Sequence, residues 1–115
     1  MKTEMTRYSK NPDKSNRKNT LFTIRDGDNV FFGIARCNRF VGDTFRKSQG
    51  QMIAKARAIR AKIDFDTMPA ELGMPPFLTH ANGLRGFCDK ANIVELLQYF
   101  ESIDDIMREE AKSGG

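Results

Sequence analysis

Three scarcities in this sequence of 115 residues limit what the protein can be: it has two cysteines, one histidine and no tryptophan. Cys37 and Cys88 form no CxxC pair, and together with a single histidine they do not make a structural zinc site. Counting alone leaves a disulfide between them open, but in a reducing compartment we expect two free, partly buried thiols. We therefore predict no metal and no cofactor.

Long apolar runs are also missing. No segment reaches the roughly 18 consecutive apolar residues that suggest a membrane-spanning helix. The N-terminal stretch MKTEMTRYSKNPDKSNRKN is polar and basic, and it lacks the apolar region of a secretory signal. We expect a cytoplasmic protein with no membrane partner.

Recognisable catalytic groupings are scarce too. The glycines match neither a phosphate-binding loop nor a dinucleotide fingerprint. His80 has no partner that the sequence identifies, and Cys88 has no base beside it, although Arg85 would lower its pKa if the two were close. Asp64 and Asp66 would share a face of an extended segment, but such a pair is more often solvated loop charge. We predict a protein that is not an enzyme, with a small enzyme using Cys88 or His80 as the third alternative.

What the sequence has is basic charge, concentrated towards its start. Residues 1–62 hold 15 Lys or Arg and 5 Asp or Glu, whereas residues 93–115 hold 2 and 6. This asymmetry suggests either a basic working surface or an acidic C-terminal helix that balances a basic one within the fold.

At this length the chain should form one small domain. We expect residues 1–19 to be a disordered basic arm, residues 20–112 to be the domain, and residues 113–115 to be a frayed tail. Residues 20–37 predict a β-hairpin that turns at DGDN, with a positive φ angle at Gly27. Because the second strand is apolar on both faces, one face should take the first helix. The other face needs the C-terminal helix, which we favour, or a second copy or a partner.

Two helices are predicted, over residues 42–63 and 91–111. The first has Asp43 as its N-cap, and the apolar stripe that should face its core is Phe45, Met52, Ala56, Ile59 and Ile63. The second carries the stripe Ile93, Leu96, Leu97, Phe100, Ile103 and Met107, with Asp104 near it and a bend after Ser102. Between the helices, Asn82-Gly83 suggests a second short hairpin that joins FLTH to LRGFC. The predicted fold class is α+β: a β-hairpin packed against a basic amphipathic helix and an acidic C-terminal helix.

The first helix carries its basic residues on two flanks. Arg46, Arg57 and Arg60 share one flank of the apolar stripe, while Lys47, Lys55 and Lys62 lie on the opposite flank or towards the back. Gly50 lies within the arginine flank, where a glycine costs about 1 kcal/mol relative to alanine and allows another backbone to come close.

Arginine forks suit phosphates and carboxylates, so this flank is the predicted binding site. The residues that we assign to it are Arg36, Arg39, Arg46, Gly50, Arg57 and Arg60, with Lys14, Arg17 and Lys18 of the arm. They would contact nucleic acid, DNA or RNA, or else an acidic protein surface. The alternative is that the arginines face solvent or pair internally with acids of the second helix such as Glu95, Glu101 and Asp105.

Two stretches, FFGIARCN and GDTFRKSQGQMIAKARAIRA, resemble short open reading frames of tailed bacteriophages over about a third of the chain. The matching residues are Gly33, Ile34, Ala35 and Cys37, then Asp43, Phe45, Lys47, Gly50, Ile53, Ala54, Arg57 and Ala58. The resemblance implies a viral accessory protein in the host cytoplasm, and such proteins often bind host nucleic-acid machinery. It identifies no target and no catalytic residue.

Our first hypothesis is therefore a non-catalytic protein that binds nucleic acid through phosphates, with little base specificity. The second is a phage-type regulator or inhibitor of a host protein, such as RNA polymerase or a defence effector. The sequence also allows a homodimer.

Overall fold

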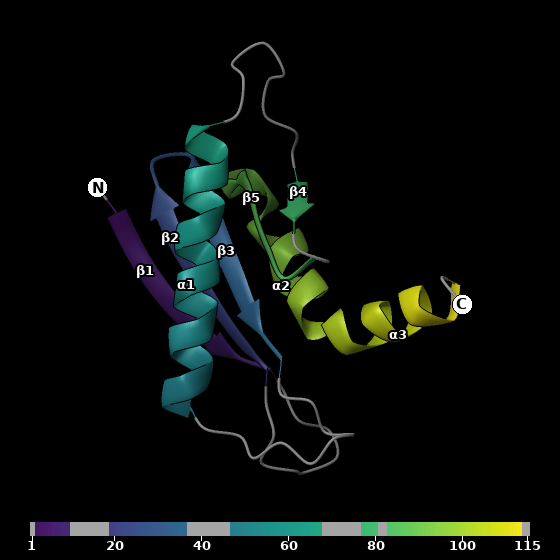
Figure 1. Cartoon of the computed structure of the whole chain (residues 1–115). Helices are drawn as coiled ribbons and strands as arrows, with labels where there is room; N and C mark the ends of the chain where they lie inside the picture. Colours follow the sequence, from purple (N-terminus) through teal and green to yellow (C-terminus); the bar gives the residue numbers. More distant parts are fainter. Residues whose placement is uncertain (1, 10–18, 37–46, 68–76, 81–82, 114–115) are drawn as a thin grey trace.

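The computed structural model describes residues 2–9, 19–36, 47–67, 77–80 and 83–113 (Figure 1). Its elements are β1 (Lys2–Tyr8), β2 (Thr20–Asp26), β3 (Asn29–Ala35), α1 (Lys47–Asp66), β4 (Phe77–His80), β5 (Arg85–Asp89), α2 (Ile93–Glu101) and α3 (Ile103–Ser113), with a short 3-10 helix (Lys90–Asn92) before α2. The fold class is α+β, as predicted. None of the helices in the described ranges is both long and apolar enough to cross a membrane.

All strands join one antiparallel sheet in the order β1-β2-β3-β5-β4. The predicted hairpin is confirmed as β2 and β3, which pair from Thr20↔Ala35 to Asp26↔Asn29. Gly27 in the turn has the expected positive φ, +63°. The second short hairpin is confirmed as β4 and β5, with Gly83 at φ +83° in the connection.

The prediction of a disordered arm was wrong for its first part. Residues 2–8 form β1, which pairs with β2 along its whole length, from Lys2↔Asp26 to Tyr8↔Thr20. The first four residues of β1 are exposed, and an edge strand tolerates such a polar, charged sequence because it needs a hydrogen-bonding partner on one side only. The basic residues of the arm between positions 10 and 18 lie outside the described residues.

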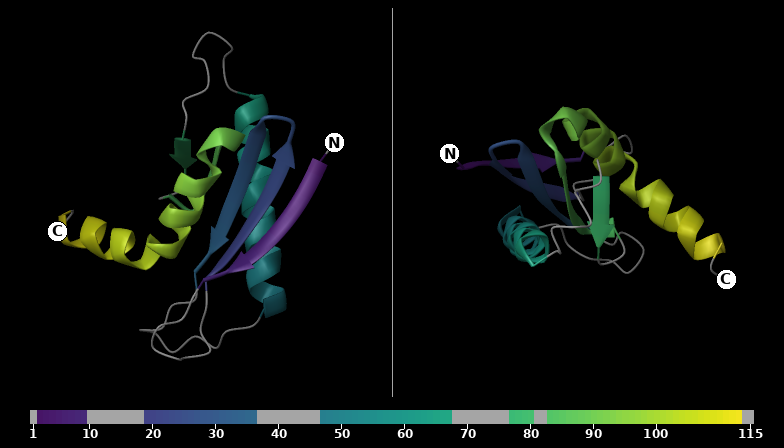
Figure 2. Two further views of the ribbon diagram at one scale, coloured as in Figure 1. Left: turned by 180° about the vertical axis from the view of Figure 1, so that it is seen from behind. Right: turned by 90° about the horizontal axis from the view of Figure 1, so that it is seen from above.

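The sheet is covered on both faces, α1 on one and α2 on the other, as expected from the two-sided apolar pattern of β3 (Figures 1 and 2). On the α2 side the buried cluster is Leu21, Val30, Phe32, Ile34, Cys88, Leu96, Phe100 and Ile103. On the α1 side it is Phe22, Ile24, Phe31, Ala35, Ala54, Ala58, Ala61 and Phe87, with Phe65 packed against it.

The C-terminal helix breaks where a bend was predicted. The backbone N–H of Ser102 donates to the carbonyls of Gln98 and Tyr99, ending α2, and α3 then leaves the sheet (Figure 1). Asp104, which lies near the apolar stripe, accepts from the side chains of Asn19 and Arg36. The first residue of the predicted frayed tail, Ser113, is the last residue of α3.

The prediction of which face of α1 is buried was wrong. Met52, Ile59 and Ile63 are 66%, 43% and 46% exposed, and Ala56 is exposed as well. Phe45, the fifth member of the predicted stripe, lies outside the described residues. Ala54, Ala58 and Ala61 are fully buried instead, so small residues make the contact with the sheet.

Gly33 explains why alanines face the sheet. A Cβ atom on Gly33 would overlap the carbonyl oxygen of Ala54 and the backbone nitrogen of Ala58, and would lie 2.6 Å from the Cβ of Arg57. The backbone of α1 therefore rests directly on β3. The bulk in this layer comes from phenylalanines of the sheet, so large residues on the helix would overfill it.

Candidate interaction surface on α1

The outward face of α1 carries its large apolar side chains. We call Met52, Ala56, Ile59 and Ile63 the outer stripe. At about 100° per residue, this stripe is centred opposite the buried Ala54 and Ala58. It extends about 16 Å along the helix, given a rise of about 1.5 Å per residue. Ile53, also partly exposed, lies at its edge.

The side chains of the outer stripe are exposed, and no other described helix or strand lies over the outward side of α1 (Figures 1 and 2). Single exposed apolar residues are normal on protein surfaces. A continuous row of several exposed apolar residues is different, because exposed apolar patches of this kind mark sites of interaction. The row is therefore the first candidate for a functional surface.

Lysines border the outer stripe on one side. The ammonium groups of Lys55 and Lys62 lie 5.8 Å from the ring centroid of Phe22 and 5.5 Å from that of Phe31, respectively. Lys62 also pairs with Asp66, with 3.3 Å between Nζ and Oδ2. The ammonium groups of both lysines thus lie over phenylalanine rings of the sheet, beside the outer stripe.

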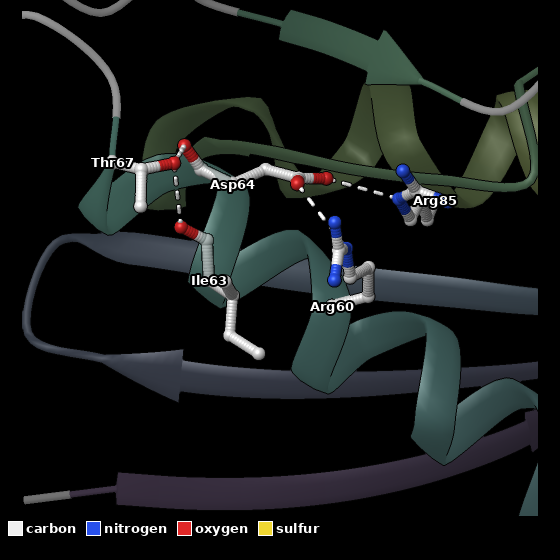
Figure 3. A network of polar contacts seen from close by, with 5 residues as sticks. All are labelled: Arg60, Ile63, Asp64, Thr67 and Arg85. Carbon is white, nitrogen blue, oxygen red and sulfur yellow. Dashed lines mark hydrogen bonds and ion pairs between the residues drawn. The ribbon is translucent and has the colours of Figure 1, made fainter.

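Arginines border the other side, gathered around the carboxylate of Asp64 (Figure 3). The Nε atom of Arg85 donates to Oδ2 of Asp64 at 3.0 Å, and the Nε atom of Arg60 lies 3.5 Å from Oδ1. Thr67 Oγ1 donates to the carbonyls of Ile63 and Asp64 at the end of the helix. Asp64 and Asp66 were expected to be solvated loop charge, or to share a face if extended; both instead lie on the last turn of α1.

The side chain of Arg57 makes a hydrogen bond within the fold. Its Nη1 donates to the carbonyl of Ile34 at 2.6 Å, and burial together with the charge of Arg85 lowers the pKa of Arg57 below its ordinary value. This bond fastens α1 to β3 beside Gly33. The guanidinium is thereby partly buried and has one of its donors engaged within the fold, which leaves less of it for phosphate contact.

The predicted arginine site is only partly assembled. Arg57 and Arg60 lie together, but Arg36 reaches α3 on the α2 side of the sheet, where its Nη2 is 3.0 Å from Asp104. Gly50 is half-buried on α1. The remaining predicted residues, Arg39, Arg46, Lys14, Arg17 and Lys18, lie outside the described residues. Internal pairing, the alternative, applies to Arg36 and Arg60, although their acids are Asp104 and Asp64 rather than the three proposed.

The outer stripe was missed as a surface because it was assigned to the core. A signal was present: Ala54, Ala58 and Ala61 repeat with helical spacing just as the bulky residues do. Two apolar rows on one helix mean that one faces the sheet and the other does not.

Cys88 is buried in β5 and is not set up as a nucleophile. Burial, together with the negative charges of Asp89 and Glu95, raises the pKa of its thiol to about 11. An activated cysteine has a lowered pKa. Within the described ranges, no three His, Cys, Asp or Glu side chains gather where they could hold a metal ion. The side chain of His80 lies outside the description.

The raised pKa of Cys88 makes stability fall in alkali. Below about pH 9 the thiol is protonated in both states, but between about pH 9 and 11 only the unfolded chain releases the proton. The free energy of unfolding should therefore drop by about 2 kcal/mol over this window. Urea unfolding at pH 8, 9.5 and 11 measures it, in a Cys37→Ser background. The matched Cys88→Ala variant should show a smaller drop; equal slopes would contradict the expectation.

Comparison of the chain with models of protein families, with curated proteins and with solved structures finds no significant match.

Proposed function

We propose that this chain is a non-catalytic binding protein and that the outer stripe of α1, with its basic borders, binds a protein partner. The observation that carries the proposal is the exposure of Met52, Ile59 and Ile63 on a helix whose opposite face is fully packed. Burying such side chains contributes about 1.5–3 kcal/mol each when they leave water completely. A protein partner can supply the apolar surface against which these side chains would be buried.

A protein partner fits these residues better than a nucleic-acid backbone does. Phosphates offer charge but little apolar surface, and two of the arginines predicted to meet them, Arg36 and Arg57, are bonded within the fold. Protein interfaces commonly combine an apolar centre with a polar rim. The outer stripe and its lysines and arginines have this arrangement.

Nucleic-acid binding through phosphates is the second candidate. The exposed cations Lys55 and Arg60 on α1 favour it, as does the basic excess of the first half of the chain. Affinity for a random-sequence DNA duplex should then fall steeply as salt rises from 50 to 200 mM, roughly as a negative power of the salt concentration whose exponent grows with the number of phosphates contacted.

The resemblance to short phage proteins indicates where to look for a protein partner. We propose a regulator or inhibitor acting on the host's nucleic-acid machinery, such as RNA polymerase or an anti-phage defence effector. In that role a stable surface is sufficient, and no reaction need take place on the protein.

Photo-cross-linking tests the surface. A benzophenone amino acid replaces Ile59 in one variant and Val94 in another; Val94 is equally apolar and 58% exposed, but lies on α2 across the sheet. In nuclease-treated extract of the cells in which the protein occurs, we expect a distinct protein cross-linked from position 59 and not from position 94. The same products from both positions, or none from position 59, would contradict the proposal. Cross-linked nucleic acid in untreated extract would favour the second candidate.

A further inference from the structure

Resting on the proposed function, we infer that the outer stripe takes an amphipathic helix of another protein whose flanking residues are acidic. Two features of α1 lead to this partner: the spacing of the exposed apolar residues, and the net positive charge on both sides of them.

The spacing is that of a helix-pairing seam. Met52, Ala56, Ile59 and Ile63 follow one another at four, three and four residues, which is the alternation of core positions in two-stranded helix packing. A surface that binds an extended peptide or a flat sheet has no need for this repeat. Ala56 has the smallest side chain of the row, so a side chain of the facing helix can pack there between the larger neighbours.

The positions beside such a seam set the choice of partner, because side chains from the two helices meet there. On α1 these positions hold Lys55 and Lys62 on one side, and Ile53 and Arg60 on the other. Each charged residue among them is a cation. Arg60 shares the single carboxylate of Asp64 with Arg85, and Lys62 pairs with Asp66 beside Lys55. Each side thus has two cations and one carboxylate and keeps a net positive charge.

This charge pattern argues against a second copy of the chain as the occupant. If two α1 helices paired in parallel, Lys55 would face Arg60 of the other copy. If they paired antiparallel, Lys55 would face Lys62. Either arrangement sets cation against cation, whereas glutamates or aspartates on the partner would neutralise both borders.

Two synthetic helices probe this directly. Both have three heptads with leucine and isoleucine at the seam; one carries glutamate at the flanking positions and the other carries lysine. Fluorescence anisotropy with the full chain, near physiological salt, measures both affinities. We expect the acidic helix to bind at least about tenfold tighter than the basic one, and Ile59→Asp to weaken it by about tenfold or more. The control Val94→Asp should leave its affinity unchanged.

A charge-swapped variant makes the test sharper. Lys55→Glu combined with Arg60→Glu should reverse the preference, so that the basic helix binds tighter than the acidic one. Circular dichroism checks that each variant remains folded, as expected for substitutions of exposed residues.

The inference is overturned if neither helix binds, if both bind equally, or if Ile59→Asp binds the acidic helix like the unaltered chain. It is also overturned if sedimentation shows a dimer that Ile59→Asp abolishes and Val94→Asp does not, because the occupant is then a second copy. A protein cross-linked at position 59 with no binding of either helix would leave the proposed function standing and remove only the helical partner.

Discussion

Replacing Gly33 with alanine is expected to lower the free energy of unfolding by about 3 kcal/mol or to prevent folding, because the layer between β3 and α1 has no room for a methyl group. The added Cβ would meet the backbone of Ala54 and Ala58 rather than the ends of flexible side chains. Relief requires moving the whole helix, which would also strain the bond from Arg57 to the carbonyl of Ile34. Urea unfolding followed by circular dichroism measures the loss.

Gly27→Ala is the matched control. Gly27 has φ +63° and nothing within 4 Å of an added Cβ, so alanine there meets backbone strain but no collision. A cost of about 1–2 kcal/mol is expected from the left-handed conformation alone. If Gly33→Ala cost no more than Gly27→Ala, α1 would not be seated on β3 as described.

The second large effect distinguishes the two faces of α1. Ala58→Leu should cost about 3 kcal/mol, because Ala58 is fully buried against the sheet and three more heavy atoms have nowhere to go. Ala56→Leu, the same change two residues earlier, should alter stability by no more than about 0.5 kcal/mol, because that side chain is exposed. Thermal unfolding of both variants gives the comparison.

A larger loss of stability from Ala56→Leu than from Ala58→Leu would support the buried face first expected from the sequence. If Ala56→Leu were the damaging change, the stripe of Met52, Ile59 and Ile63 would be packed and the proposed binding surface would disappear. The pair is also useful for function: Ala56→Leu keeps the fold but adds bulk at the small position of the outer stripe, so it should affect partner binding alone.

Much of the fold could be predicted because its signals are local. Turn chemistry at Gly27 and at Asn82-Gly83 marks both hairpins, and an unbroken apolar strand such as β3 needs cover on both faces wherever it occurs. The C-terminal stripe, with Leu96, Phe100 and Ile103 buried, was also predicted, since it has only one apolar face to offer.

What the sequence by itself determined is therefore the set of elements: two hairpins, a basic helix, an acidic helical end, and a sheet covered on both faces. Only the tertiary structure decided that residues 2–8 join the sheet. An exposed strand has no apolar pattern of its own that would reveal it in the sequence, and it is identified by its pairing with the edge of the sheet. It also decided which face of α1 is buried. Both faces have helical spacing, and only the room left by Gly33 beneath the helix selects the alanines and leaves the larger side chains outside.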